Sequence, residues 1–267
     1  MAATQSTGRR SAVLTRKLEG GASKPVTSII RKSSEHAPPK RVTRVGNGAQ
    51  SYLYFHAVLS GRQLLKAREF AASEAVQLAL GQGKLFDESR EAETRFAQHA
   101  RSRQSRIAWL ERTAELGLTD GAATVPAWLH ATLRRAAKEA HARFGDVHCP
   151  VGYDAAGRWT PRYEPIQYSE YVAGCHYASW HTDAEAHSHD DEDTRAITIV
   201  LLLSDRSAFA GGELQVRLGG AAAPTSVGLR AGDAIAFPAK WLSHRVTEVS
   251  AGLRQSLVFW VNRPGGS

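Results

Sequence analysis

The sequence predicts an α+β, mainly β fold, with a helical first half and a strand-rich second half. Apolar residues recur at helical spacing between residues 62 and 144. From about residue 160 onward, short apolar runs rich in β-branched residues alternate with glycine-containing turns. The first fifty residues hold no aromatic side chain and too little apolar surface to fold. We therefore expect a disordered tail at 1–50, helical support at 51–150 and a strand-rich core at 151–267.

Basic charge is concentrated in the tail. Residues 1–50 hold ten Lys or Arg and two Glu, which accounts for the whole formal charge of +8. We interpret the tail as a solvated extension. A transit peptide is one alternative, because the stretch before Glu19 is basic and lacks acids, and a nucleic-acid or partner-binding arm is another. No apolar stretch is long enough for a secretion signal or a membrane span. We expect a soluble, cytoplasmic protein without membrane or nucleic-acid partners, or an organellar one if the tail is a transit peptide.

The cysteine content excludes two classes of small stabilised domain. Cys149 and Cys175 are the only cysteines, and they form no C-x-x-C pair. A disulfide framework and a structural zinc site are therefore not expected. We interpret Cys175, which lies just before the candidate metal ligands, as a small buried residue.

Four segments are expected before the core. Residues 52–59 form either a short strand or the start of a helix. Residues 62–80 carry an apolar stripe that predicts a helix, and residues 88–116 are predicted to be helical in parts. Pro126 stands at the favoured first position of a helix that runs to about Phe144. We expect these helices to brace one face of a sheet.

A basic cluster lies in the third of these segments. Arg101, Arg103 and Arg106 follow one another at short spacing. We interpret them as the solvated face of a helix, because charged runs usually face water. Contact with a substrate is the alternative.

Short strands are predicted in the second half. The run 195–203 is apolar and β-branched, as expected for a strand buried on both faces. Glycine-containing turns at 211–212 and 232–233 precede two further strands. A last strand follows Gly252. Because side chains alternate along a strand, one of its faces carries Arg254, Ser256, Val258 and Trp260.

The tripeptide His181-Thr-Asp183 is the first candidate metal-binding motif. Residues at i and i+2 of a strand point to the same side, so an imidazole and a carboxylate can meet at one point. His244 lies 63 positions after His181, far enough to belong to another strand. Two imidazoles and one carboxylate make the facial set that suits non-haem Fe(II) and leaves coordination positions open. Arg254, ten residues after His244, supplies a cation suited to a carboxylate.

A polar segment follows the motif. Residues 185–193 combine His187 and His189 with several carboxylates, which invites interpretation as a second metal site. We prefer to interpret the segment as a polar loop at the entrance of the site that gates substrate. The chain contains no G-x-S-x-G, Walker A or G-x-G-x-x-G fingerprint.

In this order, the motifs resemble the prolyl-4-hydroxylase-like branch of the Fe(II)/2-oxoglutarate dioxygenases, including the PKHD-type hydroxylases. The resemblance covers about residues 160–262. It implies a double-stranded β-helix, or jelly roll, with supporting N-terminal helices, and a dioxygenase domain over 51–267. It also implies Fe(II), 2-oxoglutarate as co-substrate and O2, with ascorbate as an optional stimulant.

The resemblance assigns roles residue by residue. It implies that His181, Asp183 and His244 are the iron ligands. It implies that Arg254 and Tyr171 hold the far carboxylate of the co-substrate. Apolar contacts around the co-substrate fall to Leu214, Val246 and Trp260.

Two positions depart from the family pattern. Tyr177 stands one residue farther from the histidine than the usual Tyr-x-x-His spacing. Leu202 falls where many relatives carry a polar co-substrate contact, and Thr198, on the same strand face, is expected to compensate. The residues expected at the mouth, as substrate contacts, are Tyr177, Trp180, His187, His189 and Trp241.

The implied reaction is hydroxylation of an unactivated C–H bond coupled to decarboxylation of the co-substrate 2-oxoglutarate. A prolyl residue in a peptide or protein is the expected substrate, and a free amino acid, including a cyclic one, is the alternative. The intact Asp183 favours hydroxylation over halogenation. Trp260 stands where a nucleic-acid demethylase would carry a second arginine, which argues against that activity. A catalytically inactive jelly-roll binding module is the alternative from another class.

Overall fold

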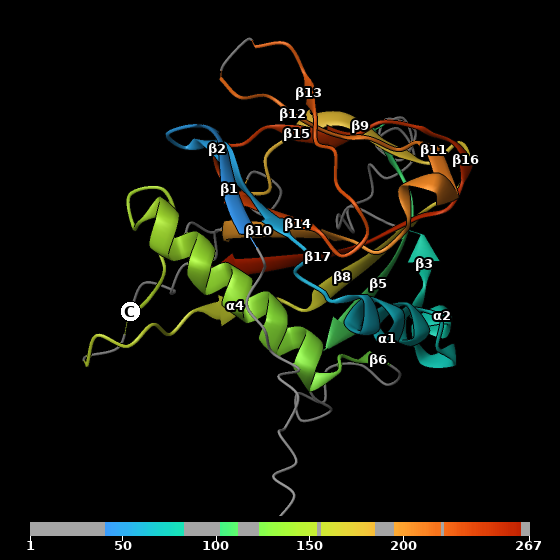
Figure 1. Ribbon diagram of the computed structural model, residues 1–267, viewed down its shortest axis with the longest axis horizontal. Helices are drawn as coiled ribbons and strands as arrows, with labels where there is room; N and C mark the ends of the chain where they lie inside the picture. Colours follow the sequence, from blue (N-terminus) through green and yellow to red (C-terminus); the bar gives the residue numbers. More distant parts are fainter. Residues whose placement is uncertain are drawn as a thin grey trace, which may run out of the picture. The chain divides into compact units, whose positions relative to one another are not determined.

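The computed structural model describes residues 41–82, 102–111, 123–153, 156–184, 195–219 and 222–262. Within them, two antiparallel sheets face each other, and helices cover the outer face of the larger sheet (Figure 1). The predictions for residues 1–40 and for the polar segment 185–193, with His187 and His189, lie outside the described residues.

The elements have the following bounds. The first half contains β1 (Arg41–Asn47), β2 (Gln50–His56), α1 (Gly61–Ala71), α2 (Glu74–Ala79), β3 (Gly81–Gln82), β4 (Arg103–Gln104), β5 (Arg106–Glu111), β6 (Ala123–Thr124) and α4 (Ala127–Phe144). The second half contains β7 (Arg162–Tyr163), β8 (Ile166–Tyr171), β9 (His176–His181), β10 (Arg195–Leu202), the 3-10 turn η3 (Arg206–Ala208), β11 (Phe209–Gly211), β12 (Leu214–Val216), β13 (Thr225–Ser226), β14 (Ala234–Pro238), β15 (His244–Val246), β16 (Val249–Gly252) and β17 (Arg254–Asn262).

The larger sheet has the strand order β1-β2-β14-β10-β17-β8-β5-β3, with β6 beside β5 and β7 beside β17. The smaller sheet has the order β13-β12-β15-β9-β4. Most neighbours in both sheets are not consecutive along the chain, as in a jelly roll, whereas β1-β2 and β12-β13, for example, are consecutive. Most notably, β4 crosses to the smaller sheet while β5, which follows it directly, pairs with β8 in the larger one.

Strand β10 separates two hydrophobic cores. Its Ile197, Ile199 and Leu201 pack with Leu129 and Leu133 of α4. Its alternate side chains Val200 and Leu202 pack between the sheets, with side chains of β12, β14 and β15. Every residue of β10 is buried, because helices cover one face of the sheet and the smaller sheet covers the other. The predicted strand buried on both faces is therefore confirmed.

Local sequence signals explain where the helices begin. The Ser60 hydroxyl caps α1 by accepting from the Gln63 backbone N–H, and the Gln63 side-chain oxygen accepts from the Ser60 backbone N–H, which completes a capping box. Pro126 immediately precedes α4, which ends at Phe144 as predicted. In the described part of the chain, no helix is both long and apolar enough to cross a membrane.

Three boundaries differ from the prediction. The predicted tail reaches residue 50, but β1 already begins at Arg41, because its backbone pairs with β2. The helical support predicted over 51–150 also contains strands, and 106–111 is β5 rather than helix. The helix predicted over 62–80 is two helices that are separated at Ser73. Strand pairing decides the first two outcomes, and the extended backbone of Ser73 ends the first helix in the third.

Candidate metal centre and its pocket

The two sheets bring three metal-ligating side chains to one point. His181 ends β9 and lies opposite His244, which begins β15. Asp183 follows two residues after β9, where its backbone N–H donates to the carbonyl of Ala239 at 3.0 Å. The Nε2 atoms of His181 and His244 lie 3.8 and 3.7 Å from Oδ1 of Asp183. All ligand atoms of the three residues lie within 4.8 Å of one another, and in the described part of the chain they form the one such group.

Backbone carbonyls orient both imidazoles. Nδ1 of His181 lies 3.0 Å from the carbonyl oxygen of Ser179, and Nδ1 of His244 lies 3.1 Å from that of Leu242. A carbonyl only accepts, so each Nδ1 carries the hydrogen and each Nε2 presents a lone pair to the centre. Burial, with His244 beside it, lowers the pKa of His181 to about 3, so this imidazole is neutral at physiological pH.

A hydroxyl orients the carboxylate. Thr198 donates to Oδ2 of Asp183 at 2.6 Å, which leaves Oδ1 facing the imidazoles. Burial alone would raise the pKa of Asp183, but electrostatic attraction from neighbouring groups, first of all His244, and the Thr198 hydrogen bond lower it to about 2. Thr198 thus acts on the carboxylate rather than as the expected co-substrate contact. Two histidines that present bare Nε2 atoms and one ionised carboxylate fit Fe(II).

A pocket of about 150 Å³ lies between the sheets at this centre. It contains the five residues to which the resemblance assigns co-substrate binding. These residues are Arg254, Tyr171, Leu214, Val246 and Trp260. The predicted face of β17 is confirmed, because Ser256 and Val258 line the pocket with Arg254 and Trp260.

Arg254 places a buried cation in the pocket. Arg254 is 2% exposed, and its Nη1 donates to the Ser256 hydroxyl at 3.0 Å. Tyr171 lies opposite it on β8, with its ring 5.4 Å from the guanidinium. Burial lowers the pKa of Arg254, but a guanidinium stays charged. Among the described residues no carboxylate pairs with it, so an anionic ligand is needed to offset the cost of burying this charge.

Two further arginines line the pocket, and sequence analysis missed one and misplaced the other. Arg195 makes a bidentate ion pair with Glu164 at 2.7 and 2.6 Å and lies over the Trp260 ring. The interpretation of Arg103 as part of a solvated helical face is wrong. It lies on β4 opposite Tyr177 and lines the pocket. No local signal in the sequence marks a pairing between strands more than seventy residues apart.

The predicted substrate contacts have different locations. Tyr177 lines the pocket, and its ring stacks on that of His181 at 3.8 Å. Trp180 points the opposite way because side chains alternate along β9, and it lies between the guanidinium groups of Arg217 and Arg245. Trp180 therefore lies outside the pocket lining. Trp241 is 43% exposed and lies outside the pocket lining.

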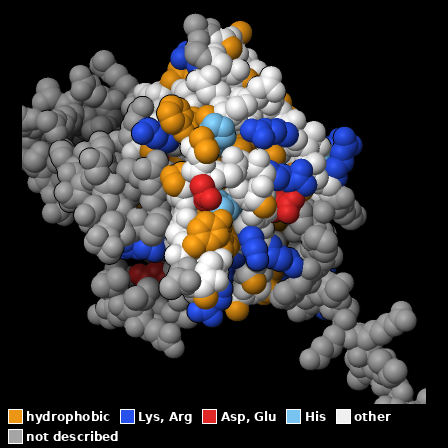
Figure 2. All heavy atoms as spheres, turned by 90° about the vertical axis from the view of Figure 1, so that its left-hand side faces the viewer, with side chains coloured by type: hydrophobic (Ala, Val, Ile, Leu, Met, Phe, Trp, Pro, Cys, Tyr) orange, Lys and Arg blue, Asp and Glu red, His pale blue; other side chains and the backbone are white. Residues whose placement is uncertain are grey.

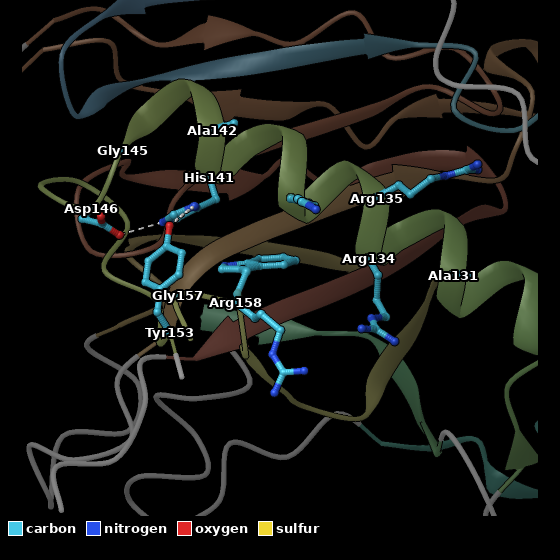
Figure 3. A pocket seen from close by; sticks show the side chains of 12 residues that line it. Ala131, Arg134, Arg135, His141, Ala142, Gly145, Asp146, Tyr153, Gly157 and Arg158 are labelled. Atoms are coloured by element: carbon cyan, nitrogen blue, oxygen red, sulfur yellow. Dashed lines mark hydrogen bonds and ion pairs between the residues drawn. The ribbon is translucent and has the colours of Figure 1, made fainter. Parts of the chain in front are cut away.

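A second pocket, of about 830 Å³, lies on the outer side of α4 (Figure 3). His141 bonds to Asp146 at 2.8 Å there, and Arg134 and Arg158 extend to the same open side. Figure 2 shows the face of the molecule at which the C-terminal end of α4 lies, and this face carries more Lys and Arg than Asp and Glu side chains. Because its lining contains no group of three metal ligands, this pocket does not compete with the His181 centre.

Comparison with known proteins agrees with this geometry. Residues 166–262 match the family model of the 2OG-Fe(II) oxygenase superfamily. No curated protein matches the chain. This match confirms the predicted resemblance to the 2OG-Fe(II) oxygenases, a class that uses Fe(II) and 2-oxoglutarate.

Solved structures share the fold at low sequence identity. A Pseudomonas putida prolyl-4-hydroxylase is 19% identical, with a TM-score of 0.51, over 79% of this chain and 92% of that one. A Trichoplax adhaerens prolyl hydroxylase, in complex with a hypoxia inducible factor peptide fragment, is 15% identical, with a TM-score of 0.52, over 79% and 83%. A Burkholderia pseudomallei oxidoreductase of the 2OG-Fe(II) oxygenase family is 18% identical, with a TM-score of 0.50, over 81% and 87%. The predicted jelly-roll fold class is confirmed.

Proposed function

We propose that the protein is a 2-oxoglutarate-dependent hydroxylase that oxidises an unactivated C–H bond, with a prolyl residue of a peptide or protein as its substrate. The observation that carries the proposal is one pocket that combines the His181, Asp183 and His244 centre with the buried cation of Arg254. The peptide in the Trichoplax adhaerens complex supports a peptide substrate.

Each residue of the pocket has a defined task in this reaction. His181, Asp183 and His244 would hold the metal from one side, because their orienting bonds aim three donors at one point. Bound Fe(II) supplies the redox chemistry that couples decarboxylation of the co-substrate to oxidation of the substrate. Arg254 would bind the far carboxylate, because a guanidinium fork matches a carboxylate.

The walls of the pocket exclude water from the reacting groups. Leu214, Val246 and Trp260 are each less than 10% exposed. Their apolar surfaces fix the position of the co-substrate between the sheets and keep competing water away from it. The stacking of Tyr177 on His181 closes the pocket beside the first ligand.

A free amino acid is the second candidate substrate. The pocket carries a cation, Arg103, besides Arg195, which Glu164 neutralises, and Arg254, which the co-substrate would neutralise. A third cation suits a substrate that carries its own carboxylate.

The test needs no knowledge of the substrate. Protein, Fe(II) and 2-oxoglutarate are mixed without oxygen, and the visible charge-transfer band of the complex is recorded. Succinate is then measured in air. We expect the band in the wild type and its loss in His181→Ala. If neither band nor succinate appears in the wild type, the protein is a binding module rather than an enzyme.

A further inference from the structure

Arg103 is a second cation of the pocket that, like Arg254, pairs with no carboxylate among the described residues. Its Nε donates to the Ser105 hydroxyl at 3.0 Å, and its guanidinium lies 5.0 Å from the centre of the Tyr177 ring. It is only partly exposed, and no carboxylate pairs with it among the described residues. A guanidinium in such surroundings retains most of its capacity to donate to an anion.

Its location places that capacity beside the reaction centre. Arg103 lies opposite Tyr177 in the pairing of β4 with β9, and Tyr177 stacks on His181 at 3.8 Å. The guanidinium is thus separated from a metal ligand by a single aromatic ring. It lines the same pocket as Arg254, which extends from β17 in the opposite sheet.

The charges of the loaded pocket leave Arg103 without a counterpart. Glu164 neutralises Arg195 through two hydrogen bonds. The positive charges of Fe(II) and Arg254 equal the negative charges of Asp183 and the co-substrate dianion. A partly desolvated cation that remains unmatched favours one more anion in the pocket.

We propose that Arg103 binds a carboxylate of the substrate, so that the enzyme selects molecules with a carboxylate close to the C–H bond it oxidises. This inference rests on the proposed function and specifies its substrate class. The carboxylate belongs either to a free amino acid or to the C-terminal residue of a peptide. A peptide that is internal or amidated lacks it.

The test uses two pairs of probes that differ only in this group. They are L-proline with L-prolinamide, and N-acetyl-Ala-Pro with its C-terminal amide. Hydroxylated product and succinate are measured for wild type, Arg103→Gln and Arg103→Lys. We expect the wild type to prefer the acid of at least one pair by roughly 10- to 100-fold in kcat/KM, as a charge-assisted hydrogen bond provides. The pair that shows the preference identifies the source of the carboxylate.

Arg103→Gln should abolish the preference, mainly through a higher KM for the acid, while Arg103→Lys retains part of it. The KM for the co-substrate and the oxygen-free charge-transfer band should stay unchanged in both variants. The shift of the charge-transfer band when the acid probe is added without oxygen gives the binding constant of that probe in the absence of turnover. Arg106→Gln is the matched control, because Arg106 is close in sequence but pairs with Glu170 outside the pocket lining.

A purely structural role for Arg103, as a support for the Tyr177 ring, predicts a different result. Loss of that support would lower kcat for acid and amide alike and would weaken the charge-transfer band. Equal use of acid and amide by the wild type, or an unchanged preference in Arg103→Gln, overturns the inference and leaves the proposed hydroxylase intact. Absence of turnover for all four probes overturns it together with the prolyl substrate, whereas loss of the band in the wild type would overturn the proposed function itself.

Discussion

Two groups of side chains in the pocket, which we call the metal end and the Arg103 end, are built on different principles. In the metal end, Asp183, His244 and Arg254 are 6%, 6% and 2% exposed, and hydrogen bonds fix the orientation of each. In the Arg103 end, Arg103 and Tyr177 are both partly exposed, although Tyr177 also stacks on His181. The metal end is buried and preorganised for the metal and the co-substrate, whereas the Arg103 end is open to a variable ligand.

Removal of the ligand carboxylate should produce the largest effect. Asp183→Ala is expected to reduce turnover below detection, because two imidazoles alone hold iron weakly and leave the charge of the metal unbalanced. The charge-transfer band and succinate formation measure the loss. The fold should persist, since the variant deletes a buried charge rather than leaving one unpaired. Asp205→Ala, which removes a surface carboxylate, is the control; residual hydroxylation in Asp183→Ala would contradict the metal assignment.

Arg254→Ala should weaken co-substrate binding specifically. Loss of a buried partner of a charged pair costs about 2–5 kcal/mol, which corresponds to a rise of roughly 30-fold or more in the KM for the co-substrate. The iron affinity should change little, because Arg254 is not among the ligands. Steady-state kinetics at varied co-substrate concentration, with the surface variant Arg143→Ala as the control, separate the two effects. An unchanged KM would mean that another group anchors the far carboxylate.

Thr198→Val tests whether orientation of the ligand matters at this end. The substitution keeps the shape of the side chain but removes the 2.6 Å hydrogen bond to Asp183. Loss of such a supporting bond typically weakens metal binding by about 10- to 100-fold. An iron titration followed by the charge-transfer band measures the change. Thr132→Val, which loses a hydroxyl contact within α4, should leave iron affinity alone; equal affinity in both variants would show that the hydroxyl does not position Asp183.

The same contrast explains what could be predicted from the sequence. The metal end depends on short-range spacing, since His181 and Asp183 are two residues apart and the pocket face of β17 follows period two. Both patterns are properties of a strand and need no knowledge of its partners. For His244 the sequence predicts only that it lies on another strand than His181, and the structure places the two histidines opposite each other.

The Arg103 end depends on pairings between distant segments. Arg103 reaches the pocket because β4 joins β9, and the chain then crosses to β5 in the other sheet. A two-residue strand has no periodicity of its own, so the charges around it wrongly predict a helical surface. The location of Trp180 differs from the expected one for the opposite reason. Its proximity to His181 in sequence suggests the pocket, although alternation along β9 turns it away.

Trp180→Phe is therefore expected to have the smallest effect. The indole lies outside the pocket between Arg217 and Arg245, at 4.2 and 4.7 Å from their guanidinium groups, and a phenyl ring retains most of that contact. Kinetic constants for co-substrate and probes should stay within about two-fold, as is usual for substitutions away from a site. Tyr177→Ala, three residues earlier on the pocket face, should by contrast lower turnover because it removes the ring stacked on His181. A large kinetic defect in Trp180→Phe with an unchanged melting temperature would mean that the substrate extends around the edge of the smaller sheet. The substrate would then contact a third region, besides the metal end and the Arg103 end.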